Sequence, residues 1–327
     1  MKNKVDQSKI HFVIYGVGAV GGSYGGQLAY YKAQRALEYN LTFLARGKTF
    51  EILKNDGISL ETIDEKTETW LSKDINVVQG LTEIKFNDDE YPVFLLCVKS
   101  KDTQACAQDI AKLALKQDYA VVSVQNGIEN EDILVQELGK EAVIGAYTNI
   151  LAESLEPGKY TRKGKYWLSI GELDGLTKAR TQAIYEQMSK AELVVKITEK
   201  IQIELWQKLV WNAGFNPASV FYEADLGQLF ANPEACERIE NIMRETKELA
   251  LKLGYKINPE IDKIHFERTK ENFSSDFKTS MLQDHLKNRP IELDQLLGVV
   301  VRKAQEINFP APYATNLYSQ MNSRSVI

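Results

Sequence analysis

The sequence is poor in the residues that build metal sites or disulfide frameworks. Its three cysteines, Cys97, Cys106 and Cys236, have neither C-x-x-C nor metal-ligand spacing, and their odd number argues against a disulfide framework. The three histidines are scattered along the 327 residues. We therefore expect neither a metal site nor structural disulfides.

Long hydrophobic runs and an excess of charge of one sign are also missing. No apolar stretch approaches the roughly 20 residues that a membrane-spanning helix needs, and the charged beginning MKNKVDQSK is not followed by an A-x-A cleavage site. A formal net charge of −5 gives no reason to expect a nucleic-acid or membrane surface. The length allows two globular domains. We expect a cytoplasmic protein that acts on small molecules.

The most informative pattern that is present lies near the start of the chain. The apolar run IHFVIY at 10–15 leads directly into Gly16, Val17, Gly18, Ala19, Val20 and Gly21. In such a strand–turn–helix unit the first glycine permits a tight turn, the second lets a phosphate approach the backbone, and the third lets helix and strand pack closely. The N–H groups at the helix start then face the anion. The pattern predicts a dinucleotide site, although glycines of an ordinary loop look similar.

The first half of the chain alternates strands and helices. Strands are predicted at 40–45, 91–98, 119–124 and 141–147, with short edge strands inside 57–89. Such alternation predicts a parallel sheet covered by helices on both faces.

Beyond residue 155 the pattern changes. The Pro157-Gly158 turn and the stretches 165–170 and 193–197 predict antiparallel pieces that close the sheet. Apolar residues then recur at three- and four-residue spacing in 200–215, 234–253 and 291–307, which predicts helices. We expect an α/β fold with a Rossmann-type domain at 1–199 and an all-α domain at 200–327.

Polar residues follow several predicted strands, where an open parallel sheet binds its ligands. Arg46, Lys99 and Asn126 occupy such positions. A cofactor with a free ribose 2′-hydroxyl usually meets an acid after the second strand, whereas a 2′-phosphate prefers a guanidinium. Arg46 therefore favours NADPH over NADH. The alternative is that Arg46 and Lys48 merely solvate a surface loop.

A second group of polar residues lies on the predicted helix that starts near residue 200. Lys208, Asn212 and Asn216 are four residues apart and would form one stripe, because such positions lie about 40° apart around the axis. Pro217 disfavours helix at Asn216 and can end or bend it there. The stripe is either a site or an exposed face.

A third group precedes the last long helix. Pro290 favours the first helical position, which puts Glu292 in the opening turn. A carboxylate at that position can simply interact favourably with the positive end of the helix dipole and accept a hydrogen bond from a backbone N–H. Ser280 can likewise be a helix N-cap.

Together these segments resemble the ketopantoate reductase (2-dehydropantoate 2-reductase) family over nearly the whole chain. The resemblance rests on GVGAVG, LARG, CVKS, QNG, KLVWNAGFNP, SMLQD and RPIELD, in the family's order and approximate spacing. It implies a Rossmann-type N-terminal domain and a helical C-terminal domain. It also implies NADPH-dependent reduction of 2-dehydropantoate to (R)-pantoate, a step towards pantothenate and coenzyme A.

The resemblance further implies roles for individual residues. Lys208 matches the family's catalytic lysine and Glu292 its active-site glutamate. The substrate contacts fall on Asn126, Asn212, Asn216 and Ser280. Lys99 and Asn126 match residues near the nicotinamide and its ribose, and Arg46 matches the arginine that faces the adenosine phosphate.

The residue types suit that chemistry. Hydride delivery to a ketone leaves charge on oxygen, so a positioned cation such as Lys208 must stabilise it and supply a proton. Glu292 would orient Lys208 or accept a hydrogen bond from a substrate hydroxyl. Arg289 either helps to bind the carboxylate or is an exposed charge. Residues 30–35 lengthen the first helix or its exit loop beyond what the family leads us to expect.

Two other functions remain open at this point. The chain could be an NADP-dependent reductase of another branched 2-oxo acid, since a missing methylene changes discrimination only modestly. It could also be a nucleotide-binding relative without turnover. Monomer and homodimer are both compatible with the sequence.

Overall fold

The computed structural model describes residues 9–273 and 275–324 of the chain. The chain divides into two compact units. Unit 1 ends at Ile201 and contains every strand that is described, and unit 2 extends from Gln202 onward. The short segment Asn126–Glu129 groups with unit 2, although the chain on both sides of it belongs to unit 1.

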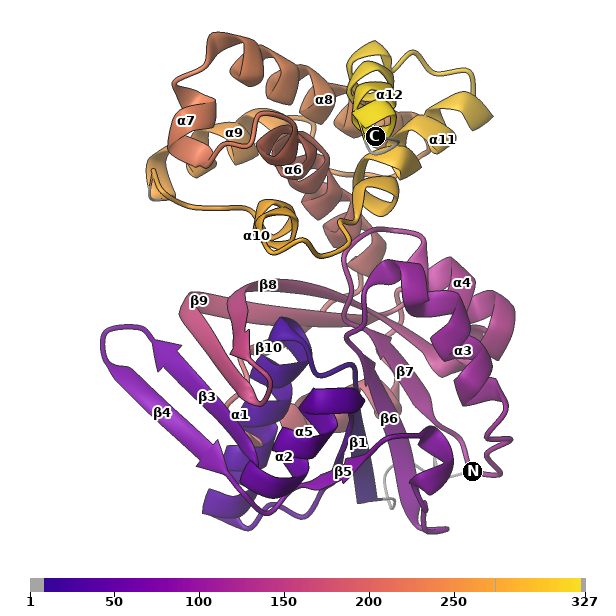
Figure 1. The fold of residues 1–327 in the computed structure, drawn as a ribbon. Helices are drawn as coiled ribbons and strands as arrows, with labels where there is room; N and C mark the ends of the chain where they lie inside the picture. Colours follow the sequence, from indigo (N-terminus) through magenta and orange to yellow (C-terminus); the bar gives the residue numbers. More distant parts are fainter. Residues whose placement is uncertain (1–8, 274, 325–327) are drawn as a thin grey trace. The chain divides into compact units, whose positions relative to one another are not determined.

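Unit 1 is built on a mixed sheet with the order β4-β3-β9-β8-β7-β6-β1-β2-β5, to which β10 adds by pairing with β9. Its strands are β1 (Lys9–Tyr15), β2 (Asn40–Leu44), β3 (Ile58–Ile63), β4 (Thr67–Ser72), β5 (Asn76–Val78), β6 (Glu90–Leu96), β7 (Ala120–Ser123), β8 (Val143–Glu156), β9 (Lys159–Glu172) and β10 (Val195–Ile197). The run from β8 to β5 is parallel throughout (Figure 1). The predicted parallel part of the sheet is confirmed.

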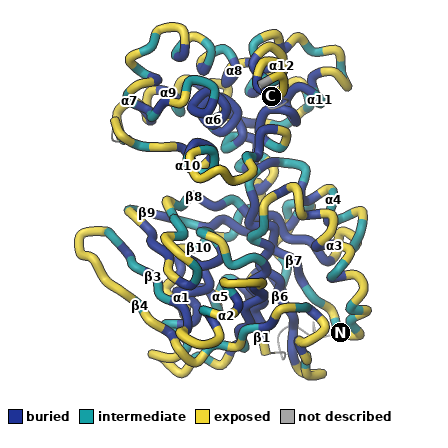
Figure 2. Tube along the Cα trace, viewed as in Figure 1, coloured by how far each residue is buried: buried dark blue, intermediate teal, exposed yellow. Residues whose placement is uncertain are grey.

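Helices cover both faces of this sheet, as predicted. One face carries α1 (Ala19–Arg35), α2 (Gly47–Asp56) and α5 (Ala179–Lys190), and the other carries α3 (Thr103–Ala111) and α4 (Asn130–Leu138). Phe12 and Ile14 of β1 belong to the core of the first face, whereas Val13 and Tyr15 belong to that of the second, because successive strand side chains alternate. The central strands are accordingly dark blue in Figure 2. The fold is of the α/β, Rossmann type.

Two details of the predicted sheet are wrong. Within 57–89, β4 and β5 are edge strands as predicted, but β3 lies between β4 and β9, with Ile58 and Leu60 fully buried. The β8–β9 pair is antiparallel as predicted, whereas β10 runs parallel to β9. The reason is that α5 separates β9 from β10, and a helical crossover returns the chain in the same direction.

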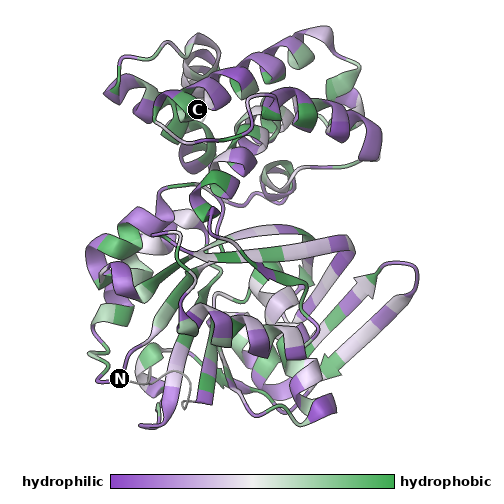
Figure 3. Ribbon diagram, turned by 180° about the vertical axis from the view of Figure 1, so that it is seen from behind, coloured by the Kyte–Doolittle hydropathy of each residue, from purple (hydrophilic) through white to green (hydrophobic). Residues whose placement is uncertain are grey.

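Unit 2 is helical over its described residues. Its α-helices are α6 (Ile201–Phe221), α7 (Leu226–Phe230), α8 (Pro233–Lys252), α9 (Ile261–Asn272), α10 (Ser280–Leu286), α11 (Val299–Glu306) and α12 (Pro312–Arg324), with a π-helical turn at Asp294–Gly298 before α11. Val210, Ala213 and Phe215 of α6 lie in its core. The other helices show hydrophobic residues in green beside hydrophilic residues in purple, which is typical of half-buried helices (Figure 3). The predicted all-α part is confirmed.

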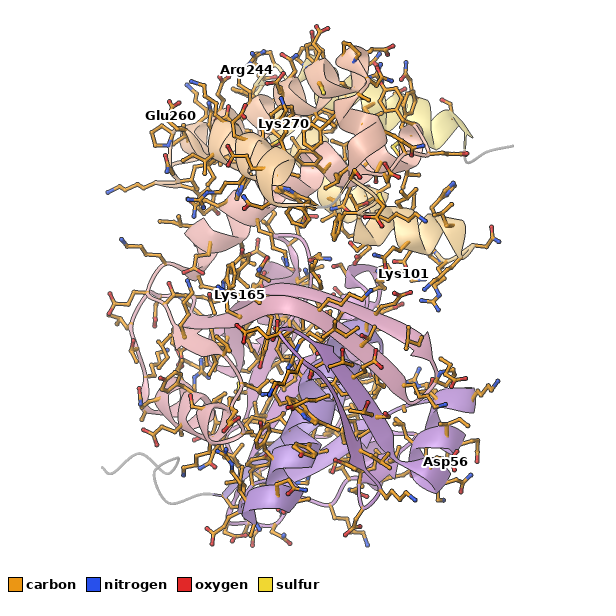
Figure 4. The ribbon with its side chains drawn as sticks, turned by 90° about the vertical axis from the view of Figure 1, so that its left-hand side faces the viewer. Asp56, Lys101, Lys165, Arg244, Glu260 and Lys270 are labelled. Carbon is orange, nitrogen blue, oxygen red and sulfur yellow. The ribbon has the colours of Figure 1, made fainter. Side chains whose placement is uncertain are left out.

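Charged side chains lie at the surface of each unit. Figure 4 labels Asp56, Lys101 and Lys165 in unit 1 and Arg244, Glu260 and Lys270 in unit 2, all of which are exposed. Among the described helices none is both long and apolar enough to cross a bilayer.

Candidate active site

The glycine turn joins β1 to α1 in the way that its spacing predicts. Gly16 adopts a φ of +96°, which an L side chain rarely takes. A Cβ built on Gly21 would lie 2.1 Å from the carbonyl oxygen of Gly16, so only glycine fits there. A Cβ on Gly18 would meet nothing within 4 Å. The first and third glycines therefore close the turn, and the second leaves its backbone open.

The start of α1 is suited to an anion. Gly18 is its N-cap residue, no side chain caps it, and no acid lies in its first turn. Val17, Ala19 and Val20 are half-buried around this point. Because the first N–H groups of a helix lack partners within the helix and carry partial positive charge, the turn fits a pyrophosphate.

Arg46 and Lys99 follow neighbouring strands of the same sheet. Arg46 follows β2 and is the exposed N-cap residue of α2; Lys99 follows β6 and is exposed. Both strands pair with β1 in parallel. The carboxyl ends of these strands, and hence the glycine turn, Arg46 and Lys99, lie along one edge of the sheet. Asn126, which follows β7, is half-buried and groups with unit 2.

Gln125, just before Asn126, joins two of these strand exits. Its Nε2 donates to the carbonyl oxygen of Val98 at 3.1 Å and to Thr103 Oγ1 at 2.8 Å. The Thr103 hydroxyl in turn donates to Asn130 Oδ1 at 2.9 Å. Sequence reasoning missed this network, because it depends on which loops the parallel strands bring together.

In unit 2, Lys208, Asn212 and Asn216 all lie on α6. The helix continues through Pro217 to Phe221, so the expectation that it can end at Asn216 is wrong. Asn212 and Asn216 are only 5% and 1% exposed, and Lys208 is half-buried. The alternative of an exposed stripe is therefore wrong as well.

The two asparagines connect α6 to α10. Asn216 Nδ2 donates to Asn212 Oδ1 at 3.0 Å, and Asn216 Oδ1 accepts from the N–H of Met281 at 3.3 Å and the hydroxyl of Ser280 at 3.4 Å. Thr279, not Ser280, caps α10, because Thr279 Oγ1 accepts from the N–H of Leu282. The expectation of Ser280 as an N-cap is wrong, and Ser280 is exposed.

Asn212 retains unused hydrogen-bonding capacity. Its Nδ2 is buried and has no hydrogen-bond partner among the described residues. A buried amide without a partner is costly unless a ligand satisfies it. The structure thus brings Asn212, Asn216 and Ser280 together and leaves one donor available.

Lys208 and Glu292 interact electrostatically. Burial lowers the pKa of Lys208 to about 8, and the attraction of Glu292 opposes this effect. Glu292 is itself buried and immediately precedes the helical segment with the π-helical turn, so the expectation that it lies in the opening turn of that helix is wrong. A lysine whose pKa lies near neutrality can both donate and accept a proton, which is the property that acid–base catalysis requires.

Arg302 is a second residue that sequence reasoning missed. Its guanidinium donates to Asp294 Oδ1 and to Glu129 Oε2, each at 2.7 Å, and the Tyr318 hydroxyl also donates to Asp294. Arg302 thereby joins the segment Asn126–Glu129 to the π-helical turn beside Glu292. Glu129 is more than 160 positions from Asp294 and Arg302, so no sequence pattern predicts that these three side chains meet.

Two further expectations concern Arg289 and metals. The Arg289 side chain is 52% exposed and lies 4.0 Å from Asp284, which agrees with the interpretation of an exposed charge. Among the residues that the structure describes, no cluster of three or more His, Cys, Asp and Glu side chains is arranged to hold a metal ion.

Comparisons with known proteins follow the same division. The family model described as ketopantoate reductase PanE/ApbA matches residues 12–175, and that of its C-terminal part matches residues 200–325. The 2-dehydropantoate 2-reductase of Archaeoglobus fulgidus is 27% identical over 296 residues, which cover 90% of each chain.

Solved structures give the same result for the fold. A PanE/ApbA family ketopantoate reductase from Ralstonia eutropha JMP134 superposes with a TM-score of 0.83 at 25% identity, covering 96% of this chain and 97% of the other. A ternary structure of D-mandelate dehydrogenase with NADH and anilino(oxo)acetate superposes with a TM-score of 0.82 at 21% identity, again covering 96% and 97%. At 21% identity the likeness shows the fold alone.

Proposed function

The chain belongs to the ketopantoate reductase PanE/ApbA family, and we therefore propose that it reduces 2-dehydropantoate to (R)-pantoate with NADPH. This reaction is a step towards pantothenate and coenzyme A. In this proposal residues 1–199 hold the cofactor and residues 200–327 supply the substrate-binding and catalytic side chains. The protein acts in the cytoplasm on a small molecule, as a monomer or homodimer.

The glycine turn and Arg46 support the choice of cofactor. Gly16–Gly21 would hold the pyrophosphate at the uncapped start of α1, and Lys99 and Asn126 would contact the nicotinamide and its ribose. Arg46 is exposed where a 2′-phosphate needs a guanidinium, and no acid lies between Leu44 and Lys48 to receive a ribose hydroxyl instead. The nicotinamide ring, when bound, supplies the hydride.

The feature that carries the proposal is the pair of opposite charges that Lys208 of α6 forms with the buried Glu292, both in unit 2, where burial also lowers the pKa of Lys208. The Lys208 ammonium donates a hydrogen bond to the ketone oxygen, stabilises the charge that hydride addition leaves there, and transfers one proton to it. The amine then takes a proton back from solvent. Glu292 keeps the lysine charged and oriented, or accepts a hydrogen bond from the substrate's hydroxyl.

Asn212 and Ser280 support the binding of a short hydroxylated acid. The unpartnered Nδ2 of Asn212 would donate to a substrate oxygen, and the exposed Ser280 at the start of α10 would offer its hydroxyl. Asn216 would contact the substrate or hold these two side chains in place, since its amide already bonds to both residues. Neutral donors of this kind suit carboxylate and hydroxyl groups.

The proposal is tested by following NADPH oxidation with 2-dehydropantoate and with a panel of other branched 2-oxo acids. We expect strong turnover on 2-dehydropantoate and a kcat for Lys208→Ala that is lower by about 10²–10⁴, the scale of a general-acid contribution. Lys252→Ala, an exposed lysine at the end of α8, is the control and should keep the wild-type rate.

Each other result selects a different function. Turnover only on other 2-oxo acids would identify a reductase of another substrate. Binding of NADPH without turnover on any acid would identify a non-catalytic relative. An undiminished rate for Lys208→Ala would remove Lys208 from the mechanism.

A further inference from the structure

Tyr160 on β9 contacts the glycine turn from a strand far away in the sequence. Its side chain is 1% exposed, and its hydroxyl donates to the carbonyl oxygen of Val17 at 2.8 Å. Val17 lies between the first two glycines of the turn. The proposed function gives Tyr160 no role.

The ring and the backbone of Tyr160 are both restrained by their neighbours. A Cβ built on Gly22 of α1 would lie 2.3 Å from its Cδ1 atom, so the ring packs directly against the helix backbone there. On the strand itself, Tyr160 pairs with Leu60 of β3 and with Ser154 of β8. Because strand pairing restrains the backbone of Tyr160 from two directions, its hydroxyl is a fixed donor rather than a mobile one.

This hydrogen bond sets the orientation of one peptide group. In a planar trans peptide the C=O and N–H bonds point in opposite directions. When the Val17 carbonyl points to Tyr160, the N–H of Gly18 therefore points away from Tyr160. Gly18 is exposed, and a Cβ built on it meets nothing within 4 Å.

Tyr160 remains a donor over the whole physiological pH range. Burial raises the pKa of its hydroxyl to about 12. The hydroxyl therefore keeps its proton near neutral pH and donates it to the Val17 carbonyl oxygen, which can only accept.

The same hairpin also lies against α2. A Cβ on Gly158, in the turn between β8 and β9, would lie 2.6 Å from Ile52 of α2, and the Gly158 carbonyl accepts from the N–H of Ser59. Since α2 begins directly after Arg46, one hairpin supports both the glycine turn and the helix that carries the predicted phosphate-binding arginine.

We propose that Tyr160 is a positioning residue for the cofactor: it holds the Val17–Gly18 peptide in the orientation that presents the Gly18 N–H to the pyrophosphate of a dinucleotide. The proposal rests on the dinucleotide site of the proposed function and not on its substrate. The pyrophosphate is common to NADPH and NADH, so the effect of Tyr160 is the same for both.

Tyr160→Phe tests this, with Tyr39→Phe as its matched control. Tyr39 is also 1% exposed, and its hydroxyl also donates to a backbone carbonyl of α1, that of Leu28, at 2.6 Å. Each substitution removes one hydrogen bond from a buried tyrosine to a backbone carbonyl, but the Tyr160 bond goes to Val17 in the glycine turn, whereas the Tyr39 bond goes to Leu28 within α1. The dissociation constants of NADPH and NADH are measured by fluorescence titration, and melting temperatures are measured alongside.

We expect Tyr160→Phe to raise both dissociation constants by the same factor, about 3- to 10-fold, the effect of one lost hydrogen bond. Tyr39→Phe should change neither by more than about 2-fold, although both variants lose similar thermal stability. Arg46→Ala is a useful comparison, because it should weaken NADPH far more than NADH.

The proposal is overturned if Tyr160→Phe leaves the dissociation constants unchanged, if it affects only one cofactor, or if Tyr39→Phe weakens binding as much. A wild-type protein that binds neither cofactor would overturn both this proposal and the proposed function. Intact binding without turnover on any 2-oxo acid would overturn the proposed function alone.

Discussion

At the scale of single residues, Lys208 shows how burial moves the pKa of a side chain towards neutrality. Its pKa of about 8 results from burial, against the opposing attraction of Glu292. The sequence indicated both residues through the family resemblance, but their types and spacing alone left open whether Lys208 lay on an exposed face and whether Glu292 was only a helix cap. Only the structure brings the two charges together.

The lowered pKa predicts a pH profile. In the proposed mechanism, reduction needs the ammonium form of Lys208, so kcat/KM for 2-dehydropantoate should fall as pH rises through about 8. Oxidation of pantoate needs the amine and should rise over the same range. Both are measured by initial rates between pH 6 and 10, at roughly one-unit spacing.

Glu292→Gln is the informative variant for this profile. Removing the attraction that raises the Lys208 pKa should move the descending limb to lower pH. If the descending limb of the Glu292→Gln profile moves to higher pH, or if the wild-type kcat/KM does not change between roughly pH 6 and 10, the titrating group is not Lys208 paired with Glu292.

At the scale of elements, the amide of Asn216 joins α6 to α10, alongside a hydrogen bond between the hydroxyls of Ser219 and Thr279. Asn216 uses its Nδ2 towards Asn212 and its Oδ1 towards the start of α10. The helical spacing of Asn212 and Asn216 was readable from the sequence, because it follows from the geometry of one helix. The hydrogen bond from Met281 of α10 to Asn216 could not be read from the sequence, because the two residues are 65 positions apart.

We predict that Asn216→Ala destabilises the protein by about 2–3 kcal/mol, because it leaves the buried partners Asn212 and Met281 without their hydrogen bonds. It should also raise the KM for 2-dehydropantoate more than it lowers kcat. Urea unfolding and steady-state kinetics measure the two effects.

The control for this variant is Asn272→Ala. Asn272 is an exposed residue at the end of α9, and its amide donates to the carbonyl of Arg268 in the preceding turn. Its substitution should change stability by less than about 0.5 kcal/mol. Equal losses for the two variants would argue against a special role for the junction.

At the scale of the whole molecule, a buried polar cluster joins three strands of unit 1 at their amino ends. His11 of β1 lies 3.1 Å from Glu90 of β6 and 2.9 Å from Thr42 of β2. Burial disfavours the charge on Glu90, but the N–H of Asn87 and the His11 ring outweigh it, and the pKa of Glu90 lies below its ordinary value.

A lowered carboxyl pKa contributes stability that is present above the unfolded-state pKa and is lost as pH falls through the folded-state value. Glu90→Gln should therefore be less stable than wild type at pH 7, by about 1–3 kcal/mol. The difference should shrink as pH falls below about 4. The midpoint of urea unfolding at several pH values measures this.

Glu65→Gln is the matched control, since Glu65 is an exposed residue between β3 and β4. Its midpoint should follow that of wild type at every pH. A constant gap between Glu90→Gln and wild type down to acid pH would show that the charge of Glu90 is not what stabilises the cluster.

Features that depend on local geometry could be predicted from the order of the residues alone. The order of elements, the glycine turn and the helical stripe of Lys208, Asn212 and Asn216 follow from backbone conformation and from the periods of strand and helix. Residues 30–35, which the sequence placed in the first helix or its exit loop, form the last part of α1.

Contacts between segments far apart in the sequence became known from the folded structure. The parallel pairing of β10, the bond from Tyr160 to Val17, the contact of Arg302 with Glu129 and the shifted pKa of Lys208 all join residues that no local pattern relates. Such contacts depend on how the elements pack, and burial and hydrogen bonding then give each side chain its chemistry.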